Sequence, residues 1–258
     1  MTRAQRDRRE RLAPWLLLAA VLLVWELACR GFGVSDFIFP SPSRIAQQLW
    51  QFHAVIAMHA WRTFWVTMLG FGLAIVVGVL LGFLVGSSRL AYAAMYPLMT
   101  AFNALPKAAF VPILVVWFGI GVGPAVLTAF LISFFPITVN IATGLATLEP
   151  ELEDVLRVLG ARRRDVLLKV GLPRSMPYFY ASLKVAITLA FVGTTVSEMT
   201  AANEGIGYLL VSAGSSMQMG LAFAGLVVVG GMAMVMYELF AVLEKRTTGW
   251  AHRGSRGA

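Results

Sequence analysis

Long runs of apolar residues, separated by short polar segments, make up most of this chain. A helix needs about 20 apolar residues to cross the hydrocarbon of a bilayer. Runs of suitable length cover residues 12–30, 63–86, 91–118, 122–147, 176–198 and 219–243. The pattern therefore predicts an all-α, polytopic membrane protein with six transmembrane helices in one transmembrane domain, residues 12–244.

Two of these spans come from one apolar stretch, residues 91–148, which carries a single charge at Lys107. The stretch is too long for one span and fits two. The segment FGIGVGP, residues 118–124, is rich in glycine and ends in proline, so it predicts the turn between them. Pro106 and Pro112 indicate that the first of the two spans is broken near Lys107.

Small residues recur at every fourth position of the run 63–86. On a helix this spacing forms a stripe that lets a neighbouring helix approach the backbone closely. We therefore expect helix packing along Gly70, Ala74, Gly78, Gly82 and Gly86.

The segment between the first two spans has a different pattern. Residues 40–57 begin with a proline turn and continue as a short amphipathic helix would. We expect this helix to lie on the outer membrane surface.

Lysine and arginine concentrate on one side of the predicted spans. Cytoplasmic loops of membrane proteins carry an excess of these residues. With the N-terminus inside, 16 of the 21 fall in the inner segments 1–11, 87–90, 149–174 and 245–258. We therefore predict that both termini are cytoplasmic (N-in/C-in), with 1–11 and 245–258 as cytoplasmic tails.

The composition supports the lipid bilayer as the solvent of this chain. The 258 residues are 59% hydrophobic and only 13% charged, whereas soluble domains carry about a quarter charged residues. The net charge of +8 lies in the segments between the spans, so it indicates membrane orientation and no nucleic acid partner. Cys29 is the single cysteine, which excludes a disulfide within the chain.

The inner segment 149–174 has more order than a simple loop. Its first part, LEPELEDVLRVLG, predicts a helix that begins at Pro150 and ends at Gly160. Four apolar residues within it follow the i, i+3, i+4, i+7 spacing of one helix face. Its second part, ARRRDVLLKVGLP, predicts another short helix that Pro173 halts. The excess of basic residues in cytoplasmic loops explains the positive charge of this segment but not its helical pattern. The pattern therefore favours a docking surface for a cytoplasmic partner.

The same segment resembles the EAA loop of ABC-importer permeases, in which an E-A-A triplet, a glycine and a Leu-Pro pair stand at fixed spacing. Aligned on Gly160, the triplet is Asp154-Val155-Leu156 and the pair is Leu172-Pro173. The spacing matches throughout, and the departures are the two bulky residues in place of alanines. By this resemblance, coupling to an ATPase is assigned to Asp154, Val155, Leu156, Arg157, Gly160, Ala161, Leu172 and Pro173. Arg162, Arg163 and Arg164 either pair with acidic groups of the ATPase or only set the orientation.

The resemblance extends over nearly the whole chain. The segments VWELACRGFG, FPSPSRIAQQLW, LPKAAFVPILVVWFGIG, FFPITVNIATGL and SEMTAANEGIGYLL are similar, in order, to the nitrate/sulfonate/taurine-type subfamily of binding-protein-dependent importer permeases. This resemblance implies a type I ABC importer permease fold in a bacterial cytoplasmic (inner) membrane. The solute stays open between a nitrate-, sulfonate- or taurine-like anion and a heterocyclic vitamin precursor such as a pyrimidine or flavin.

The resemblance also implies partners. No lysine follows a glycine, so the chain has no Walker A loop for ATP, and we expect no cofactor on this chain. ATP and Mg would be bound by separate ABC ATPase subunits. A second permease copy, most simply in a homodimer, and a periplasmic or lipid-anchored substrate-binding protein would complete the importer.

Polar groups within the spans are candidates for the translocation path or gate. They are Lys107, Asn140 and Glu198, followed by the turn Gly205, Ile206 and Gly207, which resembles the entry to the external gate of the family. Lys107 either meets an anionic substrate or extends to the membrane surface. For Asn140, structural packing is favoured. Lys184 and Glu238 are expected to extend to the nearby cytoplasmic surface.

Other functions fit less well. An intramembrane enzyme lacks a site, because the histidines lie outside the expected spans and no HExxH or paired aspartates occur within one, so neither catalytic residues nor a metal site are expected. A coupling subunit of another vitamin-importer class would have longer cytoplasmic helices. A passive channel would have no need of the EAA spacing.

Overall fold

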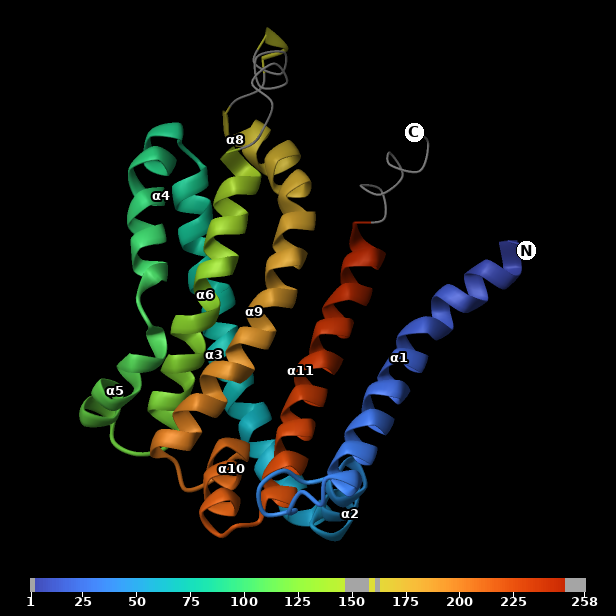
Figure 1. Cartoon of the computed structure of the whole chain (residues 1–258). Helices are drawn as coiled ribbons and strands as arrows, with labels where there is room; N and C mark the ends of the chain where they lie inside the picture. The colour runs from blue at the N-terminus through green and yellow to red at the C-terminus, as the bar shows by residue number, and fades with distance from the viewer. Residues whose placement is uncertain (1–2, 147–157, 161–162, 249–258) are drawn as a thin grey trace.

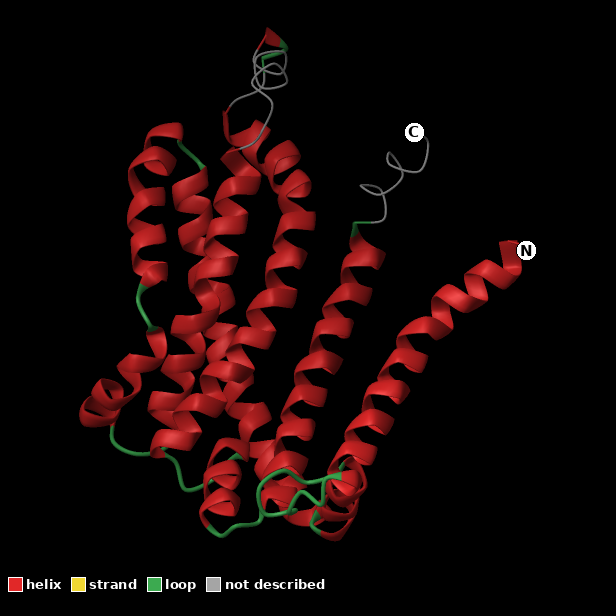
Figure 2. Cartoon of the chain, viewed as in Figure 1, coloured by secondary structure: helices red, strands yellow, loops and turns green. Residues whose placement is uncertain are grey.

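The computed structural model describes residues 3–146, 158–160 and 163–248. Every regular element in these ranges is helical, as Figure 2 shows, which confirms the all-α prediction. Within the described ranges, five helices are long and apolar enough to cross a membrane. A sixth span results when the pair Leu90–Ala104 and Lys107–Phe118, bent by 73° at a short break, is counted as one. The break confirms the interruption predicted near Pro106, and its cause is the lost amide donor and fixed φ of proline.

The helices follow one another through short connections. Those before the segment 147–157 are α1 (Arg3–Gly31), α2 (Pro42–Gln51), α3 (His53–Gly86), α4 (Arg89–Ala104), η1 (Lys107–Phe110), α5 (Val111–Phe118) and α6 (Val122–Ala146). Those after it are α8 (Arg163–Val166), η2 (Leu167–Gly171), α9 (Leu172–Ala201), α10 (Ile206–Ser215) and α11 (Met219–Thr247).

Helices α3, α6 and α9 pack together as the centre of the bundle. Their facing sides bury apolar side chains almost completely, among them Val66, Ile137 and Phe191. Glycine brings α3 and α6 close together, because an added Cβ at Gly78 would lie 2.9 Å from Cβ of Ile137. The predicted small-residue stripe faces α6 at Gly70, Gly78, Gly82 and Gly86, and Ala74 between them is fully buried.

The two ends of the bundle differ. In Figure 1 the last turn of α6, α8, the N-terminal end of α1 and the C-terminal end of α11 lie at one end, while α2, α5 and α10 lie at the other. The predicted orientation makes the first end cytoplasmic. Helix α3 has 34 residues and is about 51 Å long, which exceeds the roughly 30 Å of hydrocarbon. Its first turns therefore reach the outer surface.

Two sequence predictions about helix boundaries are wrong. The amphipathic helix expected over 40–57 ends at Gln51, and the residues from His53 onward belong to α3 rather than to a separate surface helix. The segment 53–62 contains neither proline nor glycine, and its polar side chains find partners in the fold, so nothing ends the helix before residue 63. Helix α1 begins at Arg3, so it includes most of the predicted tail 1–11, whose cytoplasmic location stays a prediction.

The second is the helix stop at Pro173. This proline lies in the first turn of α9, and the π-helical segment η2 runs into α9 without a break. Proline is well tolerated in the first turn of a helix, because the amide there has no acceptor within the helix. Pro173 therefore starts the long helix instead of halting a short one.

Candidate functional site

Polar groups gather where α9 ends and α10 begins, at the outer end of the bundle. Gly205 has a φ of +104°, a conformation that glycine adopts without strain, and it turns the chain into α10. Three successive backbone amides then meet side chains of other helices. The amide of Gly205 donates to Nδ1 of His59 at 3.0 Å, that of Ile206 to Oγ1 of Thr63 at 2.7 Å, and that of Gly207 to Oε2 of Glu198 at 3.0 Å.

Glu198 is the most buried carboxylate of this site, with 3% of its surface exposed. The hydroxyl of Thr63 donates toward both of its oxygens, at 3.0 and 2.8 Å. A buried carboxylate is costly unless hydrogen bonds replace its water, and these donors supply them. A Cβ at Gly205 would overlap the carboxyl group itself, and one at Gly207 would lie 2.6 Å from Cβ of Glu198. Glycine is therefore required where the backbone rests on this side chain.

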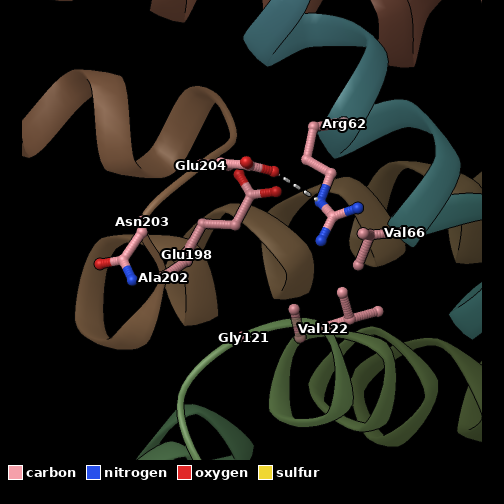
Figure 3. A pocket seen from close by; sticks show the side chains of 9 residues that line it. Arg62, Val66, Gly121, Val122, Glu198, Ala202, Asn203 and Glu204 are labelled. Atoms are coloured by element: carbon pink, nitrogen blue, oxygen red, sulfur yellow. Dashed lines mark ion pairs between the residues drawn. The ribbon is translucent and has the colours of Figure 1, made fainter.

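A cavity of about 210 Å³ adjoins Glu198. Figure 3 shows Arg62 facing Glu204, with Nε and Oε2 3.3 Å apart, and Asn203 also lines the cavity. The start of α6 supplies an apolar wall that includes Val122. The cavity therefore combines a positive charge, a negative charge and a side-chain amide with an apolar wall, at the outer end of the bundle.

Two other polar candidates, Lys107 and Asn140, make hydrogen bonds within their own part of the chain. The ammonium of Lys107 donates to the backbone and side-chain oxygens of Asn103, both at 2.7 Å, and lies 5.8 Å from the ring centre of Phe135. The side-chain amide of Asn140 donates to the carbonyl of Pro136, four residues earlier on α6, at 2.8 Å. The structure does not bring either residue to the Glu198 site.

The described residues among those predicted to couple to an ATPase lie at the opposite end of the bundle, which the predicted orientation makes cytoplasmic. Gly160 has a φ of +85°, Arg163 and Arg164 belong to α8, and Leu172 and Pro173 begin α9. The remaining assigned residues, which are Asp154, Val155, Leu156, Arg157, Ala161 and Arg162, lie outside the described residues.

The partners of Glu198 are not among the site residues predicted from the sequence. His59, Arg62 and Thr63 stand three and four residues apart, so they share one face of α3. That spacing indicates a polar helix face, but His59 and Arg62 precede the uncharged apolar run, which begins at Thr63. The prediction that Lys184 extends to the membrane surface is also wrong. Its Nζ lies 2.6 Å from Oε2 of Glu244 on α11, and both side chains are largely buried.

Metal chemistry finds no support in the part of the chain that the structure describes. No group of three or more histidine, cysteine or acidic side chains lies close enough to hold an ion there. The polar groups instead sit at helix ends and between spans.

A bundle of apolar spans with one broken span defines a multi-pass membrane protein. Residues 74–249 match the family model described as "Binding-protein-dependent transport system inner membrane component", and the chain belongs to this family. This confirms the resemblance of the sequence to importer permeases.

Named relatives and one solved structure agree with this assignment. The formylaminopyrimidine transport permease protein ThiX of Halalkalibacterium halodurans is 33% identical, over 76% of this chain and 79% of its own. The taurine transport system permease protein TauC of Escherichia coli is 25% identical, over 90% and 87%. A structure titled for inward-facing conformations of the MetNI methionine ABC transporter has a TM-score of 0.67 and 16% identity, covering 76% of this chain and 98% of that one. The chain therefore has the type I ABC importer permease fold and is a permease component of an ABC importer.

Proposed function

We propose that this permease works as a homodimer in a bacterial cytoplasmic membrane, driven by separate ABC ATPase subunits that bind ATP and Mg. A single chain supplies one bundle, and α1 and α11 present wide apolar faces outward. A substrate-binding protein, periplasmic or lipid-anchored, delivers the solute to the outer end. The family assignment supports both kinds of partner.

The cytoplasmic segment 149–174 is the proposed contact with the ATPase. Helix α6 ends at Ala146, shortly before this segment, and α9 begins within it at Leu172; both helices lie at the centre of the bundle. A force applied to this segment therefore reaches the core directly, and a rigid-body movement of these helices switches the permease between inward-open and outward-open states. The EAA spacing carries this part of the proposal.

The contact can be tested by co-purification with the ATPase encoded beside the permease. The variant combines Asp154→Arg with Gly160→Val, and the control combines Arg253→Glu with Arg256→Glu in the cytoplasmic tail. We expect the first variant to elute as a folded permease without ATPase, and the control to retain it. Retention of the ATPase by the first variant would exclude this segment as the docking surface.

For the solute, we favour a heterocyclic vitamin precursor over an anion. The relative named for formylaminopyrimidine transport is more similar to this chain than the one named for taurine transport. Among the described residues, both lysines of the predicted spans, Lys107 and Lys184, already have partners. An anion would have to displace one of these partners, or displace Glu204 from Arg62 at the outer cavity.

Uptake into proteoliposomes tests the solute. Vesicles would contain the permease, its ATPase and its binding protein, with ATP inside. We expect formylaminopyrimidine or riboflavin to accumulate, and nitrate and taurine not to. Accumulation of taurine or nitrate alone would favour the anion. Solute movement that is equal with and without ATP would instead indicate a passive channel.

A further inference from the structure

Helix α10 begins without a local cap. The first amides of a helix have no acceptor within it, and neighbouring side chains usually supply one. In α2, for example, Ser41 accepts from the amide of Arg44 three residues on. The amides of Gly205 and Ile206 instead bond to His59 and Thr63 of α3, which precede them by 146 and 143 residues.

The third amide is held by α9. Gly207 donates to Glu198, and Thr63 joins this carboxylate to the amide of Ile206, because its hydroxyl contacts both. The first turn of α10 is therefore attached to two central helices by side chains that are themselves buried. Separating it would leave a buried carboxylate and three amides without these partners, which is unfavourable.

We propose that His59, Thr63 and Glu198 are positioning residues that fix the first turn of α10 to α3 and α9, so that the outer gate moves with these helices and not as an independent flap. This proposal rests on the proposed function, because it assigns the gate of the same importer. It predicts that the attachment stays intact in both states of the transport cycle.

The experiment measures backbone hydrogen exchange of the peptide covering residues 203–210 in the full permease–ATPase complex. Thr63→Val removes the hydroxyl at nearly constant volume, and Thr63→Ser restores it. Thr67→Val is the matched control, because Thr67 is also buried on α3 but bonds to the carbonyl of Thr63 and to Thr194, away from α10. Glu198→Gln tests the carboxylate.

We expect faster exchange in residues 203–210 for Thr63→Val and Glu198→Gln, and wild-type exchange for Thr63→Ser and Thr67→Val. Solute uptake should fall about tenfold in the first pair, since unpaired buried groups cost enough to displace the turn. Their basal ATP hydrolysis should stay within about twofold, because the cytoplasmic contact is untouched. A general loss of packing would instead lower both activities and raise exchange throughout α3.

Two results would overturn the proposal. One is wild-type uptake by Thr63→Val with residues 203–210 still protected. The other is faster exchange of these residues in the wild-type complex when it is trapped with vanadate and Mg-ATP, since the turn would then detach during the cycle. This second measurement decides the question even if Thr63→Val fails to assemble. Failure of the proposed function is distinct, because the wild-type permease itself would then recruit no ATPase.

Discussion

Gly70 sets the distance between α3 and α6 at the residue scale. A Cβ there would lie 2.6 Å from both Cβ of Ala129 and the carbonyl oxygen of Val126. Because one of these neighbours is backbone, the helices themselves would have to move apart. A glycine at Gly72, half a turn away on the same helix, has nothing within 4 Å of its missing Cβ.

We expect Gly70→Ala to destabilise the bundle by about 1–3 kcal/mol, as overpacking of a tight interface does. The matched variant Gly72→Ala should change stability by no more than about 1 kcal/mol and in the stabilising direction, since alanine favours helix. Thermal unfolding in detergent measures both. Equal stability of the two variants would mean that α3 and α6 are not in close contact.

Gly160 has a left-handed φ of +85°, and nothing lies within 4 Å of its missing Cβ. Substitutions there therefore change the backbone preference without creating a steric clash. We expect Gly160→Val to abolish ATP-coupled uptake while membrane insertion is kept, because a branched side chain strains this conformation. Gly160→Asn should retain most uptake, since asparagine tolerates it. Loss of uptake in the asparagine variant as well would indicate that the side chain, not the conformation, matters.

Residue-scale contacts were also the least predictable from sequence. Glu198 was recognised as unusual because a charge within a span is costly. The spacing of His59 and Thr63 places them on one face of α3, but no sequence pattern links that face to Glu198, which lies more than 130 positions away. Only the packing of α3 beside α9 brings these groups together.

At the element scale, Lys184 and Glu244 join α9 to α11. Their side chains are 18% and 14% exposed, and the atoms lie 2.6 Å apart, so the pair is largely shielded from water. The ring of Tyr237 lies 5.9 Å from the ammonium group as well. Helix α9 begins within the predicted coupling segment, so this pair would transmit a movement of α9 to α11.

We expect Lys184→Gln to lower stability by about 3–5 kcal/mol, because it leaves a shielded carboxylate without its partner. The exchanged pair Lys184→Glu with Glu244→Lys should recover much of this loss. As a control, Asp36→Asn removes the exposed, 3.7 Å pair with Arg44 and should cost about 0–1 kcal/mol. Unfolding in detergent compares the four proteins, and no recovery in the exchanged pair would exclude a direct interaction.

The elements themselves were well predicted where one physical rule decided the outcome. Hydropathy located the apolar spans, and proline located the break between α4 and η1. The prediction was wrong where one residue type is compatible with two structures, because a proline such as Pro173 can follow the end of a helix or begin one. Its place in the first turn of α9 depends on how the preceding segment folds, which the residue alone does not determine.

For the whole molecule, the orientation in the membrane is the property that composition predicts most directly. Phe32, beyond the outer end of α1, and Val158, in the predicted coupling segment, are 86% and 88% exposed. In a background with Cys29→Ser, we expect Phe32→Cys to react with a membrane-impermeant maleimide in intact cells, and Val158→Cys only after permeabilisation. The opposite result would reverse the topology and move the Glu198 site to the cytoplasm.

The fold and family of the whole chain followed from sequence because both depend on long, repeated patterns: apolar runs, basic inner segments and fixed motif spacing. The outer polar site did not, because it is made of single residues from three helices that meet only in the folded bundle. The sequence supplied one of its members, Glu198, and the glycines that rest on it.

The attachment of α10 to α3 also has a consequence for biosynthesis. Thr63 leaves the ribosome long before Glu198 and Gly207, so α3 enters the membrane while its buried polar face has no partner. A chain that stops short of α9 presents that face to lipid or to the insertion machinery. Glu198 and Ile206, which are made late, therefore supply the partners of Thr63 on α3, which is made early. A permease that lacks them has unpaired polar groups at the surface where solute would enter.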